Sequence, residues 1–383
     1  MKIIFLCGCL EPGRDGVGDY TRRLSIELIR LGHQVTALAL SDGFITAPLE
    51  EKQVIENEHL QVLRIPASVS RKDCLILSKT WVTKHDPSWV CLQFVPFSFS
   101  SKGLPFYLPA FLKEVGKGRA WHIMFHELWV FINFEKSKKQ WLLGNIQRWL
   151  IKQLVFTLRP LIIHTQTRLY QKYLYQIGFE SKYLPLFSNI PVIQEPGGPV
   201  KDLGVESTKR LSFVIFGSIH PDSLFGDFTN DAILYSARNS VEVSLVFIGR
   251  YNAEQKHWCS VWTTAGLKAI LLGERSPEQI SKELKKACIG ITTTPLVLVE
   301  KSGTVAAMRE HGLPVVCIAR PWFPKNYEGV FSSEIFTYSK GNFESILAKS
   351  LKPSTINSLL NITTQFVDDL ESTKHGSRQQ MNT

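Results

Sequence analysis

Short apolar runs alternate with segments of helical periodicity along most of the 383-residue chain. A bounded run of about four to eight apolar residues is typical of a buried strand, and apolar residues three or four apart are typical of an amphipathic helix. Strands are predicted at 3–7, 34–40, 60–65, 89–95, 121–125, 161–164, 211–216, 243–248, 269–272, 289–292 and 315–318. The alternation predicts an α/β protein whose parallel sheets are covered by helices.

The alternation pauses once, between about 189 and 209, where prolines and glycines accumulate around charged residues. Such a stretch is typical of a linker, and the chain length suits two domains. We therefore expect an N-terminal domain at 1–190, a linker at 191–209 and a C-terminal domain at 210–350. A helix predicted at 351–370 can cross back to the N-terminal domain, and the polar segment 371–383 is expected to be a disordered tail.

A glycine-rich segment follows the first predicted strand and contains Gly16, Val17 and Gly18 at the start of a predicted helix. Glycine lets a backbone approach a ligand closely, and free N–H groups at a helix start attract an anion. The spacing is not G-x-G-x-x-G, so it does not favour a nicotinamide cofactor. A tight turn that binds nothing remains the alternative.

Two further groups of polar residues follow predicted strands. His126 comes directly after 121–125, at a carboxyl end of the sheet where open α/β folds bind ligands. A lone histidine is more often structural, so both roles stay open. The segment 300–304 places a lysine, two hydroxyls and a glycine at a helix start, which suits a diphosphate without matching a Walker motif. A solvated helix start is the alternative there.

Several short motifs then follow one another in a characteristic order. They are Gly16-Val17-Gly18-Asp19-Tyr20-Thr21, Leu31-Gly32-His33, His126-Glu127, the segment 184–191, the segment 216–221, Lys301-Ser302-Gly303 and the segment 311–315. In this order they resemble the family 4 nucleotide-sugar glycosyltransferases of the GT-B fold, over about residues 2 to 350. The resemblance implies two Rossmann-like α/β domains that face a central cleft.

The resemblance also implies an activity. It is retaining, metal-independent transfer of a sugar from a nucleotide sugar in the C-terminal domain to a glycan or lipid-linked acceptor, in a context of polysaccharide biosynthesis, with no cofactor. The roles beside the donor sugar would fall on His126 and Glu300. Donor-binding roles would fall on Gly16, Val17, Gly18, Gly217, Ser218, Arg250, Lys301, Ser302, Gly303 and Thr304. No D-x-D sequence occurs, which agrees with phosphate stabilisation by side chains and helix ends.

The chain departs from the family pattern at two places. Most members carry two glutamates before the final glycine, and here the second position falls on Ala307 while the first falls on Val299 or Glu300. The basic residue expected after the first C-domain strand is also missing, which leaves Arg250 and Lys301 as cations for the diphosphate. A catalytically weak or inactive relative that binds a sugar nucleotide or a partner protein is therefore the alternative function.

The formal net charge of +10 indicates an anionic partner. Nucleic acid is not expected, because no nucleic-acid-binding module is found. The segment 136–159 mixes tryptophans with lysines and arginines, which is typical of a helix on an anionic membrane, although the same helix must also bury one face on its own sheet.

Location follows from the same patterns. The first apolar run is too short for a secretory signal, and the seven cysteines show no disulfide or zinc spacing. We expect a cytoplasmic protein, with peripheral contact at the inner face of the membrane as a further hypothesis.

Overall fold

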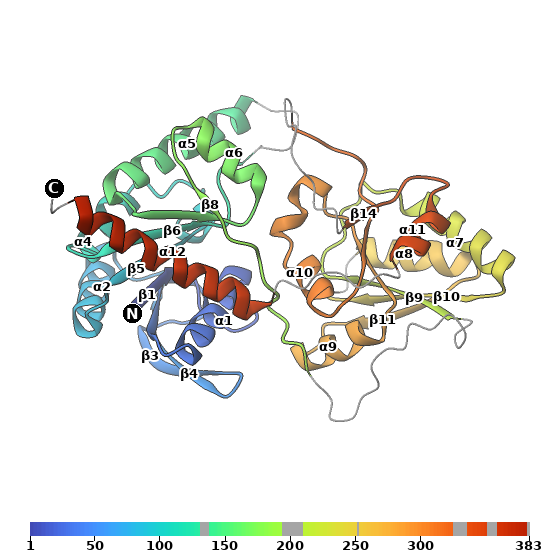
Figure 1. Ribbon diagram of the computed structural model, residues 1–383, viewed down its shortest axis with the longest axis horizontal. Helices are drawn as coiled ribbons and strands as arrows, with labels where there is room; N and C mark the ends of the chain where they lie inside the picture. Colours follow the sequence, from blue (N-terminus) through green and yellow to red (C-terminus); the bar gives the residue numbers. More distant parts are fainter. Residues whose placement is uncertain (131–137, 194–209, 251–252, 325–334, 351–357, 381–383) are drawn as a thin grey trace. The chain divides into compact units, whose positions relative to one another are not determined.

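The computed structural model describes residues 1–130, 138–193, 210–250, 253–324, 335–350 and 358–380. The chain forms two compact α/β units (Figure 1). The N-terminal unit comprises Met1–Pro185 and Leu359–Thr383, and the C-terminal unit comprises Leu186–Ser358. Most of the predicted linker, residues 194–209, lies outside the described residues.

The N-terminal unit is built on an eight-stranded sheet in the order β3-β4-β2-β1-β5-β6-β7-β8. All neighbours are parallel except β3 and β4, which form an antiparallel pair. The strands are β1 Lys2–Cys7, β2 Gln34–Asp42, β3 Leu49–Ile55, β4 Glu58–Pro66, β5 Trp89–Phe94, β6 Ala120–Phe125, β7 Ile162–Thr165 and β8 Lys182–Tyr183. The helices are α1 Gly16–Arg30, α2 Arg71–His85, α3 Pro96–Phe99, α4 Leu108–Val115, α5 Lys138–Leu158, α6 Arg168–Gln176 and α12 Leu359–Gln380.

The C-terminal unit is built on a parallel six-stranded sheet in the order β11-β10-β9-β12-β13-β14. The strands are β9 Arg210–Phe216, β10 Glu242–Ile248, β11 Lys268–Gly273, β12 Ile289–Thr292, β13 Val315–Cys317 and β14 Ile335–Thr337. The helices are α7 Phe225–Asn239, α8 Ala253–Thr264, α9 Pro277–Lys286, the 3₁₀ helix η1 Leu296–Lys301, α10 Gly303–Glu310 and α11 Phe343–Ser350. This order is the doubly wound order of a Rossmann sheet, whose order reverses between its first and fourth strands, here β9 and β12.

Every strand predicted from an apolar run is present. Most of these strands are covered on both faces and therefore need such runs, whereas the edge strand β11 is largely exposed. Ser276 caps α9 in a capping box with Gln279. The strands β3, β8 and β14 were not predicted.

Helix α12 continues to Gln380, through most of the segment 371–383 that was expected to be a disordered tail. Once a helix is nucleated, each further residue costs little free energy. The nucleus is well anchored, since Phe366 and Leu370 are fully buried in the N-terminal unit. Asp369 also bonds to His164 and to Lys182 in that unit, at 2.9 and 2.5 Å. Residues 381–383 lie outside the described part.

Candidate functional site

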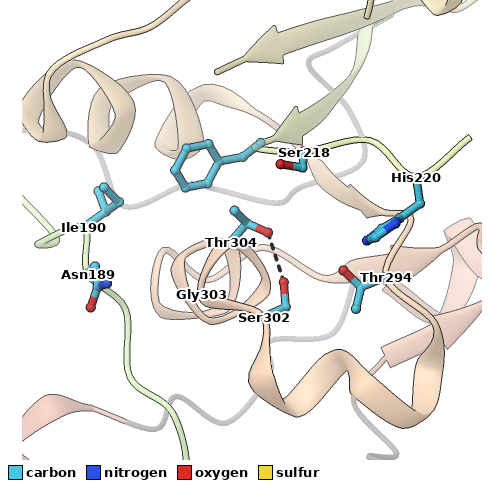
Figure 2. A pocket seen from close by; sticks show the side chains of 9 residues that line it. Asn189, Ile190, Ser218, His220, Thr294, Ser302, Gly303 and Thr304 are labelled. Atoms are coloured by element: carbon cyan, nitrogen blue, oxygen red, sulfur yellow. Dashed lines mark hydrogen bonds between the residues drawn. The ribbon is translucent and has the colours of Figure 1, made fainter. Parts of the chain in front are cut away.

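A pocket of about 340 Å³ lies in the C-terminal unit, at the point where the order of its sheet reverses. Its lining residues come from the last residue of β9, from the segments after β8, β9 and β12 and from the start of α10. They are Asn189, Ile190, Phe216, Ser218, His220, Thr294, Ser302, Gly303 and Thr304 (Figure 2). Open α/β sheets bind ligands at this position, beyond the carboxyl ends of the strands. Four of the nine lining residues carry hydroxyls, which suits a ligand rich in oxygen.

The start of α10 forms one wall of this pocket. Ser302 caps the helix by accepting a hydrogen bond from the N–H of Val305, and its hydroxyl lies 3.0 Å from that of Thr304 (Figure 2). A helix start presents unpaired N–H groups and the positive end of the helix dipole, both of which favour an anion. The β-carbon position of Gly303 has no neighbour within 4 Å, so the backbone is open to a ligand here.

The loop after β9 approaches α10 so closely that its glycine is required. Gly217 has a φ of +89°, and a side chain there would meet the Thr304 methyl group at 2.6 Å. Its neighbour Gly249, after β10, would place a β-carbon 3.3 Å from the Gly217 α-carbon. These contacts fix the distance between the β9 loop and the helix start, and therefore the width of the pocket.

The wall formed by Asn189 and Ile190 is held from the opposite end of α10. The Glu310 carboxylate accepts a hydrogen bond of 2.6 Å from the N–H of Ser188, and Ile193 donates to the Ser281 hydroxyl at 3.1 Å. The short helix α10 therefore supports two walls of the pocket, one at each end. Glu310 was not singled out from the sequence, because it lies between the motif segments 301–303 and 311–315.

Of the residues predicted to bind the donor, Ser218, Ser302, Gly303 and Thr304 line the pocket, and Gly217 adjoins it. Glu300 and Lys301 are the half-buried last residues of η1, immediately before Ser302. Arg250 is 73% exposed in its side chain and forms a 2.8 Å ion pair with Glu274. Ala307 is fully buried in the core beneath α10.

The predicted glycine loop lies in the N-terminal unit. Gly18 packs so closely that a side chain would meet the Cys9 carbonyl oxygen at 2.5 Å, whereas Gly16 has open space around it. The Asp15 carboxylate caps α1 by accepting from the N–H of Val17 at 3.0 Å. One of the N–H groups at the start of α1 is therefore already hydrogen-bonded to a carboxylate of the protein itself. Gly18 is needed for close packing against Cys9.

His126 lies in the same unit, at the carboxyl end of β6, and is only 4% exposed. Its Nδ1 lies 2.9 Å from the side-chain oxygen of Gln166 and its Nε2 lies 2.7 Å from that of Gln93. A neutral imidazole has a single N–H, so one glutamine must offer its amide nitrogen instead. Gln93 is that residue, since its Nε2 is buried without another partner in the part of the chain described.

The ionisation of His126 is strongly shifted. Burial lowers its pKa to about 4, against a smaller opposing effect of the Gln166 hydrogen bond. The unfolded chain therefore binds the extra proton between pH 6.5 and 4. Protonation of the unfolded chain therefore lowers the free energy of unfolding as the pH falls from about 6.5 to about 4. The total loss from His126 is about 3 kcal/mol, and none of it occurs above about pH 6.5. An NMR titration, with the His126 signal assigned from His126→Gln, should show a midpoint near 4; a midpoint at 6.5 would refute this burial effect.

No protein-family model matches the chain, and no curated protein sequence matches it. Solved structures do. The chain superposes on Anabaena Alr3699/HepE, in complex with UDP and glucose, with a TM-score of 0.57 and 15% identity over 97% of this chain and 100% of that one. The chain has the GT-B fold.

Other proteins of this fold also superpose on the chain. The catalytic domain of starch synthase IV from Arabidopsis thaliana, bound to ADP and acarbose, gives a TM-score of 0.57 at 10% identity over 97% of this chain and 99% of that one. The UDP-GlcNAc 2-epimerase of Neisseria meningitidis, bound to UDP-GlcNAc, gives 0.53 at 11% identity over 97% and 100%. The GT-B fold is thus shared by proteins of different activity, and the activity has to be argued from the site.

Proposed function

We propose that the chain is a glycosyltransferase that holds a nucleotide sugar in the C-terminal unit. The observation that carries this proposal is the hydroxyl-lined pocket at the start of α10, where the order of the β9–β12 sheet reverses. The diphosphate would lie at the helix start beside Gly303 and Thr304, with Ser218 on the facing loop and Lys301 as the nearby cation. Its charge would thus be balanced by N–H groups, hydroxyls and the helix dipole.

The proposed reaction is transfer with retention and needs no metal. The bond between the anomeric carbon and the diphosphate oxygen breaks, and the electron pair leaves with the nucleoside diphosphate. An acceptor hydroxyl, of a glycan or a lipid-linked sugar, bonds to the anomeric carbon on the face that the diphosphate leaves, and its proton passes to the departing phosphate oxygen. The role of the α10 start is to stabilise the negative charge that grows on that oxygen.

Lys301 supplies the charge test of this proposal. Lys301→Ala should lower the affinity for the bound nucleoside diphosphate sugar about tenfold, because a charge-assisted hydrogen bond is worth about 1.5 kcal/mol. Lys256→Ala, at an exposed position of α8, is the matched control and should leave affinity unchanged. Titration calorimetry with UDP-, GDP- and ADP-glucose measures both. Equal affinities of the two variants would refute the role of Lys301.

A second function is favoured by one observation. The position where the resembling family has its second glutamate is occupied here by Ala307. Ala307 and its neighbour Met308 are fully buried, so α10 offers no carboxylate at this position. The chain would then bind a sugar nucleotide without transferring the sugar. Release of nucleoside diphosphate from a bound nucleotide sugar, in the presence of glycan and lipid-linked acceptors, separates the two functions. Release supports the transferase, and tight binding without release supports the binding protein.

A further inference from the structure

Helix α5, labelled in the N-terminal unit in Figure 1, buries one face and leaves large apolar side chains exposed on the other. The buried face includes Gly144, Gln147, Ile151 and Leu154. On the other face, four large apolar side chains, Trp141, Leu142, Trp149 and Phe156, are 56%, 54%, 52% and 63% exposed. The requirement that α5 cover its own sheet is therefore met without using these side chains.

The exposed side chains lie along one side of the helix and are called the α5 stripe here. Leu142, Trp149 and Phe156 follow one another at steps of seven residues, two helical turns, so they share a face about 21 Å long. Phe106, from the segment before α4, extends the stripe sideways, because its ring centroid lies 6.4 Å from that of Trp149 and it is 58% exposed. An apolar surface contributed by two elements is larger than the scattered exposed side chains of an ordinary surface.

The charge of α5 has a single sign. Lys138, Lys139, Arg148 and Lys152 lie among the exposed apolar residues, and the helix contains no aspartate or glutamate. Lys138 and Lys152 lie four residues before Leu142 and Phe156, and therefore on the same side of the helix as the stripe. Tryptophans with basic residues beside them are typical of helices that lie in the interface of an anionic membrane.

We propose that the α5 stripe docks the protein on an anionic lipid surface, with α5 parallel to the membrane plane. The aromatic side chains enter the headgroup region and the cations contact lipid phosphates. None of the helices described is long and apolar enough to cross a membrane. A consequence, which rests on the proposed glycosyl transfer, is that the acceptor is carried on a lipid rather than being a free glycan.

Vesicle flotation of the full chain tests the docking directly. The protein should float with vesicles that contain phosphatidylglycerol, less at high salt, and poorly with phosphatidylcholine alone. Trp141→Ser/Trp149→Ser should weaken binding at least tenfold, because each buried aromatic side chain contributes about 1.5 kcal/mol or more. Val54→Ser/Ile76→Ser, which removes two equally exposed apolar side chains of β3 and α2, is the matched control and should bind as the wild type does.

A charge variant measures the electrostatic contribution to vesicle binding separately from the apolar contribution. Lys138→Glu/Lys152→Glu should lower the partition coefficient by about fivefold or more for each cation, the fold-change that about 1 kcal/mol represents. Lys72→Glu/Lys256→Glu changes the net charge equally at exposed positions elsewhere and should cost less than twofold. Nucleotide-sugar affinity, measured on the same variants, should not change, so the result does not depend on the proposed transfer.

Three results would overturn the docking. The first is failure of the wild type to float with anionic vesicles, and the second is flotation of the stripe variants to the same extent as the wild type. A concentration-dependent dimer that Trp141→Ser/Trp149→Ser dissociates, in the absence of vesicle binding, would show instead that the stripe is covered by a second copy of the chain. Light scattering after gel filtration detects that dimer.

Discussion

Gly303→Asp should weaken binding of the nucleoside diphosphate sugar about 30-fold and leave the protein folded. The new carboxylate would lie at the start of α10, in the pocket where the diphosphate is proposed to lie. Two like charges about 4 Å apart repel by about 2 kcal/mol in a partly solvated site, which is about 30-fold in affinity. The fold should tolerate the change, since the position has open space and an aspartate in the first turn favours a helix.

Gly303→Asn is the matched control for this variant, because it adds the same bulk without the charge. Its affinity should stay within about threefold of the wild type, and the thermal stabilities of both variants should equal that of the wild type. Calorimetric titration with the same sugar nucleotide measures the affinities. If the aspartate and asparagine variants bound equally well, the diphosphate would not lie at this helix start.

Phe366→Ala should lower the free energy of unfolding of the N-terminal unit by about 4 kcal/mol. Phe366 is fully buried, and its ring centroid lies 6.0 Å from that of Phe5 and 5.1 Å from that of His122. The substitution leaves a cavity between α12 and the sheet. Hydrogen exchange of the β1 and β6 amides measures the effect for this unit alone.

The control for Phe366→Ala lies on the same helix. Leu360 is 48% exposed, so Leu360→Ala should change the stability by about 0.5 kcal/mol or less. Both variants shorten a side chain of α12, but only the first removes buried contacts. If Phe366→Ala lowered the free energy of unfolding by no more than Leu360→Ala does, the buried contacts of Phe366 would contribute little to stability.

The sequence predicted most of the parallel strands, because each of these is a run of apolar residues between turns, but it missed the short parallel strands β8 and β14. It did not predict β3, since this edge strand carries Glu50, Glu51 and Lys52 and pairs only with β4. The β3–β4 hairpin also depends on a turn at Glu56 and Asn57, both with positive φ, and glutamate gives no signal for that conformation.

Part of the pocket could be predicted for a geometric reason. Ser218 and Ser302 are far apart in the sequence, but they follow β9 and β12, which are neighbours whose carboxyl ends lie at one edge of the sheet. Thr294 and Asn189 were not predicted to bind the donor, because their place depends on how separate segments pack. The hydrogen bond from Ser188 to Glu310 likewise joins positions more than a hundred residues apart.

The surroundings of His126 could not be predicted for the same reason. Its partners Gln93 and Gln166 lie on the segments of β5 and β7, so only the strand order brings them to the ring. Tyr20 of α1 adds an edge contact at 4.9 Å. Local sequence shows a histidine after a strand, whereas its burial and its lowered pKa arise from the whole sheet.

Hydrogen–deuterium exchange of the full chain, with and without a saturating nucleotide sugar, tests the central claim most directly. UDP-, GDP- and ADP-glucose are each added, because the pocket is proposed to recognise the diphosphate they share. For at least one of them, exchange should slow at 302–305 and at 216–220, the start of α10 and the loop after β9. Unchanged exchange at both segments with all three nucleotide sugars would contradict the proposal that this pocket holds the donor.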